Sequence, residues 1–424
     1  MKKALLLSVV ASTMIMAGGD IAPVEPVVEA PVEVSGWDFT GQAVLYYQTR
    51  DVWGNGSLFE QANLADGGNR VGNSIANAGI QLGAVNKDLF YGIGAGVELS
   101  GLGTLGLEEE IVNGTPQSAG DKNDAEITQV YLTYGIGNTS LKVGRQLLPK
   151  SLSPFAFSEG WNVFKNTFEA ALLVNTDISD TTLVYAFVKR ANSVFNLSNW
   201  SEINDDGVHM GTIQNKSIEN LTLTGTWYYA PDMLVTEDVN VLWADAKYGF
   251  GSEYGLVLGL QGGVVMGPDD LGIAGVNDTT AFGAKIGGNF GMFDASLAYS
   301  SVDDGAVPIH NLGTGVKTPL YTQMIFNQNS IKLDSDTIVA RAGMKALGGK
   351  FGIAYGYSDI GAGAYMPAVT GNVAGEGEYS ELDLTYKTKV FNDSTTLFAG
   401  YVYQDDDRMD DTQNMLRFWA RYNF

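Results

Sequence analysis

The strongest constraint on the fold of this chain is a strict alternation of apolar and polar residues, which starts near residue 37 and continues to the end. In residues 350–358, the side chains Phe351, Ile353, Tyr355 and Tyr357 alternate with glycine, alanine and serine. The same period of two recurs in residues 37–47, 221–229, 379–389 and 414–424. This period is typical of β-strands, because successive side chains of a strand point to opposite faces. With no convincing long helical pattern, the sequence predicts an all-β protein.

The connections between these segments fall into two classes that alternate along the chain. Short connections lie at 85–88, 137–139, 179–180, 251–253, 291–292, 348–350 and 391–394. Long polar or Gly/Pro-rich connections lie at 51–72, 101–124, 148–166, 191–206, 302–335 and 360–378. Tight turns at one end and long loops at the other are typical of outer-membrane barrels. We therefore predict a transmembrane antiparallel β-barrel with short periplasmic turns and long extracellular loops.

The number of strands depends on residues 191–217. A single loop there would leave an odd number of strands, whereas a strand at 207–215 followed by a turn at 216–219 restores an even number. Bacterial barrels have even numbers of strands. The prediction is therefore about 18 strands, with 16 as the alternative, and a barrel of this size encloses an aqueous channel.

The N-terminal residues predict export. Two lysines precede an apolar stretch that ends in small residues, so we interpret residues 1–19 as a signal peptide rather than a structural helix. Residues 20–35 are rich in Pro, Glu and Val and predict an extended periplasmic tether. The barrel is then a single domain over residues 36–424.

The composition restricts the chemistry. The chain has no cysteine and two histidines, His209 and His310, far apart in sequence, so neither a catalytic zinc site nor a hydrolase triad is indicated. The formal net charge of −23 becomes −25 when the two lysines of residues 1–19 are removed. This charge argues against nucleic acid as a partner and favours the attraction of cations. No cofactor is expected. Structural Ca²⁺ in the loops is a weak alternative, with Asp405, Asp406 and Asp407 as its candidate ligands.

The last residues alternate between an apolar face and a basic one. Leu416, Phe418, Tyr422 and Phe424 form the apolar face, which resembles the terminal signal that assembly machinery recognises in bacterial barrels generally. Arg417 and Arg421 lie on the other face. If Phe424 faces lipid, both arginines face the water-filled interior.

The same phasing assigns further charged residues to the interior wall. Opposed acidic and basic residues there would create a transverse field that orients solutes, although most are also explained as solvated wall residues in mutual ion pairs. Beside the two arginines, the predicted wall residues are Lys142, Lys189, Asp245, Lys247, Lys285, Arg341, Lys345, Glu381 and Asp383.

One stretch also shows a resemblance. Residues 141–187 contain a Val143–Gly144 pair, then Pro149, then Asn166–Thr167–Phe168 and a short turn into Thr181–Thr182–Leu183. This order resembles the OprD-like outer-membrane porins and the major porins of Campylobacter-type bacteria. The resemblance implies an eighteen-stranded, trimeric porin whose third long loop folds inward.

The loop at 148–166 is therefore the candidate constriction. Lys150, Glu159 and Lys165 would supply charge at the narrowest part, and Phe155, Phe157 and Trp161 would anchor the loop to the wall. An ordinary surface loop is the alternative.

Together these patterns predict a non-enzymatic outer-membrane porin through which small hydrophilic solutes and ions diffuse passively, with a lean towards cations. Its expected partners are outer-membrane lipid and lipopolysaccharide, the barrel-assembly machinery and two further copies of itself. A surface structural or adhesion barrel is the first alternative, and a hydrolase in the barrel wall is the second.

Overall fold

The computed structural model describes residues 36–424, apart from residues 52, 54–55, 60–62, 65–69, 72–73, 108–111, 113, 119–122, 235–236, 252, 268–277, 306 and 363–374. The predicted signal peptide at 1–19 and the tether at 20–35 lie outside the described residues.

The described chain consists almost wholly of strands. The wall of the barrel is formed by β1 (Asp38–Arg50), β4 (Ile75–Phe90), β5 (Ile93–Gly103), β6 (Asn123–Ile136), β7 (Thr139–Gln146), β8 (Phe168–Asn175), β9 (Thr181–Asn192), β11 (Val208–Asn215), β12 (Leu221–Leu234), β13 (Glu237–Gly249), β14 (Val257–Met266), β15 (Thr279–Phe290), β16 (Phe293–Val302), β17 (Ser335–Ala346), β18 (Gly349–Ile360), β19 (Gly377–Val390), β20 (Thr395–Asp406) and β21 (Gln413–Asn423). The loops hold a small hairpin of β2 (Asn63–Leu64) and β3 (Arg70–Val71), the short β10 (Trp200–Glu202), and a 3₁₀ turn η1 (Asn327–Ser330).

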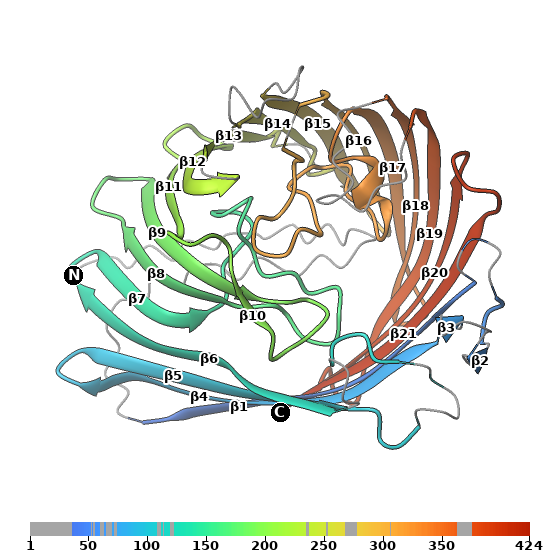
Figure 1. Ribbon diagram of the computed structural model, residues 1–424. Helices are drawn as coiled ribbons and strands as arrows, with labels where there is room; N and C mark the ends of the chain where they lie inside the picture. The colour runs from blue at the N-terminus through green and yellow to red at the C-terminus, as the bar shows by residue number, and fades with distance from the viewer. Residues whose placement is uncertain are drawn as a thin grey trace.

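Each wall strand pairs antiparallel with the next one, and β21 returns to β1 to close the sheet (Figure 1). The closing register runs from Gln42 opposite Asn423 to Arg50 opposite Met415. The predicted closed antiparallel barrel of 18 strands is confirmed. The strand expected at 207–215 is β11, which restores the even number.

The tight turns use left-handed backbone conformations. The turn predicted at 85–88 is wrong, because β4 continues to Phe90 and the chain reverses at Tyr91 and Gly92, with φ of 50° and 78°. Leu347 and Gly348 repeat this pattern between β17 and β18, with φ of 53° and 74°. Two consecutive residues with positive φ make the turn type whose twist matches that of the flanking strands.

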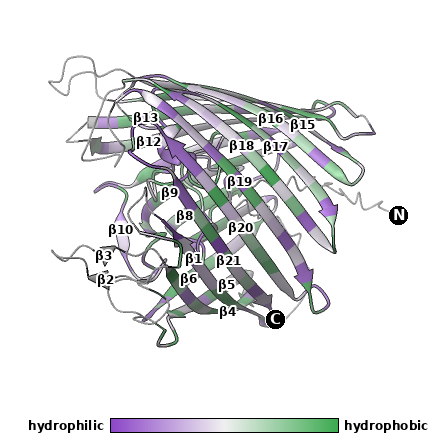
Figure 2. Cartoon of the chain, turned by 90° about the vertical axis from the view of Figure 1, so that its right-hand side faces the viewer, coloured by the Kyte–Doolittle hydropathy of each residue, from purple (hydrophilic) through white to green (hydrophobic). Residues whose placement is uncertain are grey.

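The outer face of the barrel is apolar. Large side chains such as Leu132, Ile213, Phe282 and Ile353 are exposed there, and Figure 2 shows hydrophobic and hydrophilic residues alternating along the strands. A face of this kind must be covered by something other than water. Among the residues described, no helix is both long and apolar enough to cross a membrane.

The interior is partly filled by two loops, which Figure 1 shows inside the ring of strands. Loop 147–167 joins β7 to β8, and loop 303–334 joins β16 to β17. These loops carry the candidate functional site.

Closure of the barrel makes a prediction at Gly41. Its backbone exchanges two hydrogen bonds with Phe424, of 2.7 and 2.9 Å, and a Cβ at Gly41 would lie 2.1 Å from the Phe424 ring. We expect Gly41→Val to lower the free energy of unfolding by about 1–3 kcal/mol, because the ring must move away from the seam. Urea unfolding in lipid vesicles, followed by tryptophan fluorescence, measures this change.

The matched control is Gly225→Val in the middle of β12, where a Cβ meets no atom within 4 Å. Equal losses of stability in the two variants would contradict the role of the Gly41–Phe424 contact.

Candidate functional site

Loop 147–167 is anchored to the wall by aromatic packing. The Phe155 ring lies edge-on to Tyr228 and Trp243, with ring centroids 5.8 and 5.2 Å away. The Phe155 amide also donates a 3.0 Å hydrogen bond to the Tyr228 hydroxyl. Because Tyr228 and Trp243 belong to β12 and β13, this contact holds the loop against one side of the barrel.

Side-chain amides form hydrogen bonds with the backbone groups of the same loop. Gln117 accepts from the Phe164 amide and donates to the Phe164 carbonyl, at 2.7 and 2.9 Å. Asn162 donates to the carbonyls of Pro116 and Val194. A buried loop requires such partners, since its backbone groups have neither a strand nor water to bond.

Glu159 joins the two inward loops. Its carboxylate accepts from the Asn311 amide at 2.9 Å, from the Lys317 backbone amide at 3.1 Å, and from the Thr314 hydroxyl. The Trp161 indole donates to its second oxygen at 2.6 Å. Glu159 is only 3% exposed, so the structure places it in a contact between loops and not on the solute path that the sequence suggested.

The other predicted loop residues divide between packing and polar contacts. Phe157 is buried, and the Lys150 ammonium lies 5.1 Å from its ring while donating to the Thr318 carbonyl at 2.9 Å. Trp161 is partly buried and packs edge-on to Phe195. Lys150 therefore also bonds to loop 303–334.

Loop 303–334 is the part of the site that sequence reasoning missed. Alternation and loop length predict only a long connection at residues 302–335, although it contains the apolar side chains Ile309, Leu320, Met324 and Ile331, all of which are buried. Such residues in an exposed loop would be unusual, so they were the available signal that this loop also folds inward.

Four predicted wall residues lie beneath the loops. Arg341, Glu381, Asp383 and Arg417 are each at most 8% exposed, and the first, second and fourth contact loop residues directly. These three side chains therefore contact protein atoms, which alternation alone does not reveal.

The remaining inward wall residues lie nearer to the open interior. Asp245 pairs with Lys247 at 3.2 Å and accepts from the Tyr321 hydroxyl of loop 303–334. Lys142 lies 3.6 Å above the Tyr131 ring. Lys285 on β15 and Lys345 on β17 alternate with outward-facing residues of their strands.

Three cations gather on one side of the interior, and we call Lys165, Lys387 and Arg421 the basic cluster. Arg421 lies within electrostatic range of both lysines. Lys387 and Arg421 both face the Trp419 ring, at 5.8 and 5.1 Å. Burial, with the added charge of Arg421, lowers the pKa of Lys165 to about 8. The three side chains are only partly buried, and Arg421 also donates to the Asn162 carbonyl of loop 147–167 at 2.7 Å.

The assignment of Lys189 to the interior is wrong. Lys189 continues the face of Tyr185 and Phe187 on β9, whereas Val184, Ala186 and Val188 pack against the inward loop. The pairs Glu169–Arg190 and Ala170–Val188 skip Lys189, which marks a β-bulge at this residue. The ammonium of Lys189 instead pairs with Glu202 at 3.1 Å.

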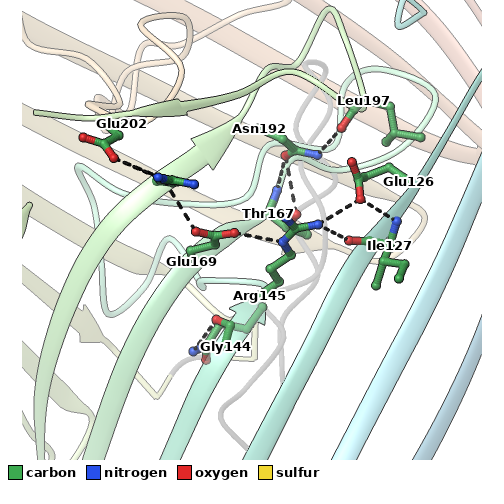
Figure 3. Close-up of polar contacts among 11 residues, drawn as sticks. Glu126, Ile127, Gly144, Arg145, Thr167, Glu169, Asn192, Leu197 and Glu202 are labelled. Atoms are coloured by element: carbon green, nitrogen blue, oxygen red, sulfur yellow. Dashed lines mark hydrogen bonds and ion pairs between the residues drawn. The ribbon is translucent and has the colours of Figure 1, made fainter.

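Lys189 belongs to an ion-pair network on the outer face at the long-loop end of the barrel. Arg145 bonds Glu126 at 2.8 Å and Glu169 at 2.9 Å, and Arg190 bonds Glu202 at 2.9 Å (Figure 3). These pairs neutralise charges that an apolar outer face would otherwise leave without partners.

The three acidic side chains of residues 405–407 do not point to one shared site. Asp406 is buried and pairs with Arg408 at 2.7 Å, Asp405 is exposed, and Asp407 accepts from the Glu378 amide. Within the described part of the chain, no group of three or more His, Asp or Glu residues could hold a metal ion.

No protein-family model matches the sequence, and no curated protein matches it either. Solved structures do match in fold. OccAB3 of Acinetobacter baumannii has a TM-score of 0.72 at 12% identity, over 92% of this chain and 100% of that chain. OpdK of Pseudomonas aeruginosa with vanillate has a TM-score of 0.71 at 15% identity, over 91% and 98%. OccK2 (OpdF) of P. aeruginosa in complex with glucuronate has a TM-score of 0.68 at 13% identity, over 92% and 98%.

These identities are low, so the likeness concerns the fold. The resemblance of residues 141–187 to OprD-like porins agrees with it, while the more specific resemblance to Campylobacter-type porins stays an expectation. This chain has the architecture of the Occ and Opd outer-membrane proteins.

Proposed function

We propose that this protein is an outer-membrane channel through which small hydrophilic solutes diffuse passively. The observation that carries this proposal is a closed barrel of 18 strands with an apolar outer face and an interior narrowed by two loops. Closure pairs the backbone groups of the wall strands, as a bilayer requires. A barrel of this width leaves room for water beside the loops.

We further propose that the channel favours small anionic solutes such as carboxylates. The basic cluster supports this proposal, because it includes Lys165 of the inward loop 147–167, and cations beside a narrowed passage act on solutes more strongly than distant acids. Two similar structures hold vanillate and glucuronate, which are both carboxylates. The expected lean towards cations rests on the acidic residues of the long loops, which act at the mouth of the channel.

Three expected partners are part of the same proposal. The apolar outer face would contact outer-membrane lipid and lipopolysaccharide, and the exposed Phe418, Tyr422 and Phe424 would be read by the assembly machinery. A homotrimer is expected by resemblance, and migration of unheated samples on gels tests it.

The channel function predicts stepwise conductance. Purified full-length protein added to a planar bilayer should give uniform current steps, because each inserted barrel opens one aqueous path. Insertion without current would contradict the channel function and would favour a surface structural role.

The anion preference predicts a change in selectivity when the basic cluster is weakened. We expect Lys387→Gln to lower the chloride-to-potassium permeability ratio about two-fold, since one cation beside the passage is lost. The reversal potential under a KCl gradient measures the ratio. Lys350→Gln is the matched control, because Lys350 is paired with Asp294 at 2.6 Å on the wall. An equal effect in both variants would argue against a special role of the cluster.

The pKa of Lys165 adds a dependence on pH. Its amine is charged below a pKa of about 8 and neutral above it, so the anion preference should weaken as the pH rises from 7 to 9. Reversal potentials measured across this range test the effect. Lys165→Gln should remove most of it, and a variant that retains the full dependence would assign it to other groups.

A further inference from the structure

A short segment of loop 303–334, residues 323–326, is held to the wall by charged side chains. Arg341 on β17 donates from Nη2 to the Gln323 carbonyl at 2.9 Å. Glu381 on β19 accepts from the Phe326 amide at 2.9 and 3.2 Å. Side chains from two wall strands thus form hydrogen bonds with the backbone at both ends of this segment.

The middle of the segment is held from inside the loop. The Lys317 ammonium donates to the carbonyls of Met324 and Ile325, at 3.1 and 2.6 Å. The backbone amide of the same lysine donates to Glu159 of loop 147–167. Lys317 therefore connects residues 323–326 to loop 147–167.

Arg417 on β21 contacts both loops at once. Its Nε and Nη2 donate to the Gln48 side-chain oxygen at 3.0 and 2.9 Å, which fixes the guanidinium plane. The guanidinium carbon lies 5.4 Å from the Phe326 ring and 6.0 Å from the Trp161 ring. A cation over an aromatic face is attracted to it, and more so when water is excluded.

These groups belong to a set of buried ionisable residues. Asp383 lies beside Glu381 and within electrostatic range of Arg341 and Lys317. The set has three acids and three bases, each at most 8% exposed: Glu159, Lys317, Arg341, Glu381, Asp383 and Arg417. Buried ion pairs contribute little net stability, but removing one partner is costly because it leaves a buried charge uncompensated. Directional bonds of this kind also allow one loop position, whereas apolar contacts allow several.

We propose that five of these residues, Glu159, Lys317, Arg341, Glu381 and Arg417, are a clamp that fixes both inward loops and thereby sets the width of the passage. The clamp rests on the proposed channel function. Its members are positioning residues that contact the inward loops and control conductance, while Lys165 and Lys387 of the basic cluster act on the charge of the solute. The apolar contact of Phe155 holds loop 147–167 on the opposite side, and the two loops are joined through Glu159.

The test uses one wall variant and one loop variant of the full-length protein. Arg417→Gln removes the cation that faces both loops. Glu159→Gln replaces one acceptor oxygen by an NH₂ group. The partners of this carboxylate described above are all donors, so at least one of their hydrogen bonds is lost. Each variant should raise the unit conductance about two-fold and increase current noise, because the loops no longer hold one position. Arg417→Lys should be closer to wild type, since it keeps the charge.

The controls separate the possible outcomes. Lys350→Gln removes a wall cation that pairs with Asp294 of the wall, and its conductance should equal that of wild type. The reversal potential of Glu159→Gln should change less than that of Lys387→Gln. Trypsin should cleave after Lys317, which is buried in wild type, in the folded Arg417→Gln and Glu159→Gln variants. A shift in gel mobility on heating shows that each barrel is folded.

A silent wild-type protein would refute the channel function itself. A conducting wild type whose Arg417→Gln and Glu159→Gln variants keep its conductance and trypsin resistance would refute the clamp alone. If Arg417→Gln does not fold, Glu159→Gln still decides the question, because its residue lies in a loop and outside the sheet.

Discussion

The rest of the structure depends on the backbone pairing between β1 and β21. This pairing joins the first wall strand to the last one, so that the sheet has no free edge. An open sheet would expose a row of unpaired amides and carbonyls, which is costly in lipid and invites aggregation in water. Closure of the sheet also creates the interior of the barrel, where every proposed functional residue lies. The ring of Phe424 over Gly41 covers the outer face of the seam.

A barrel of 18 strands is too wide for wall side chains to fill, so loops must narrow it. The two inward loops are buried by different physical means. Loop 147–167 rests on aromatic rings, which gain from leaving water without needing a precise orientation. Loop 303–334 is bonded by buried charges, which require one geometry. The combination gives a wide pore a defined narrow passage.

The burial of the loops also explains why Asn and Gln side chains lie beside them. Loops usually run over the surface because their backbone groups need water. In this protein, side-chain amides take the place of water and bond the loop backbone, at positions such as Gln117, Asn162, Asn192 and Asn311. Losing one such amide would leave a buried carbonyl or amide without a partner, which costs about 1–3 kcal/mol. The passage is thus as sensitive to these polar residues as to its charges.

The sequence by itself determined the features that follow from local periodicity. Alternation and loop length predicted the barrel, its 18 strands and the inward side of Arg417 and Arg421, since a period of two is set by the strand backbone alone. Only the tertiary structure decided what each inward residue meets. Glu159, Arg341, Glu381 and Arg417 face the interior as charges, yet they bond loops whose paths depend on contacts across the barrel. Lys189 lies on the outer face because it continues the alternation of Tyr185 and Phe187, while the β-bulge beside it becomes visible only in the pairing of β9 with β8.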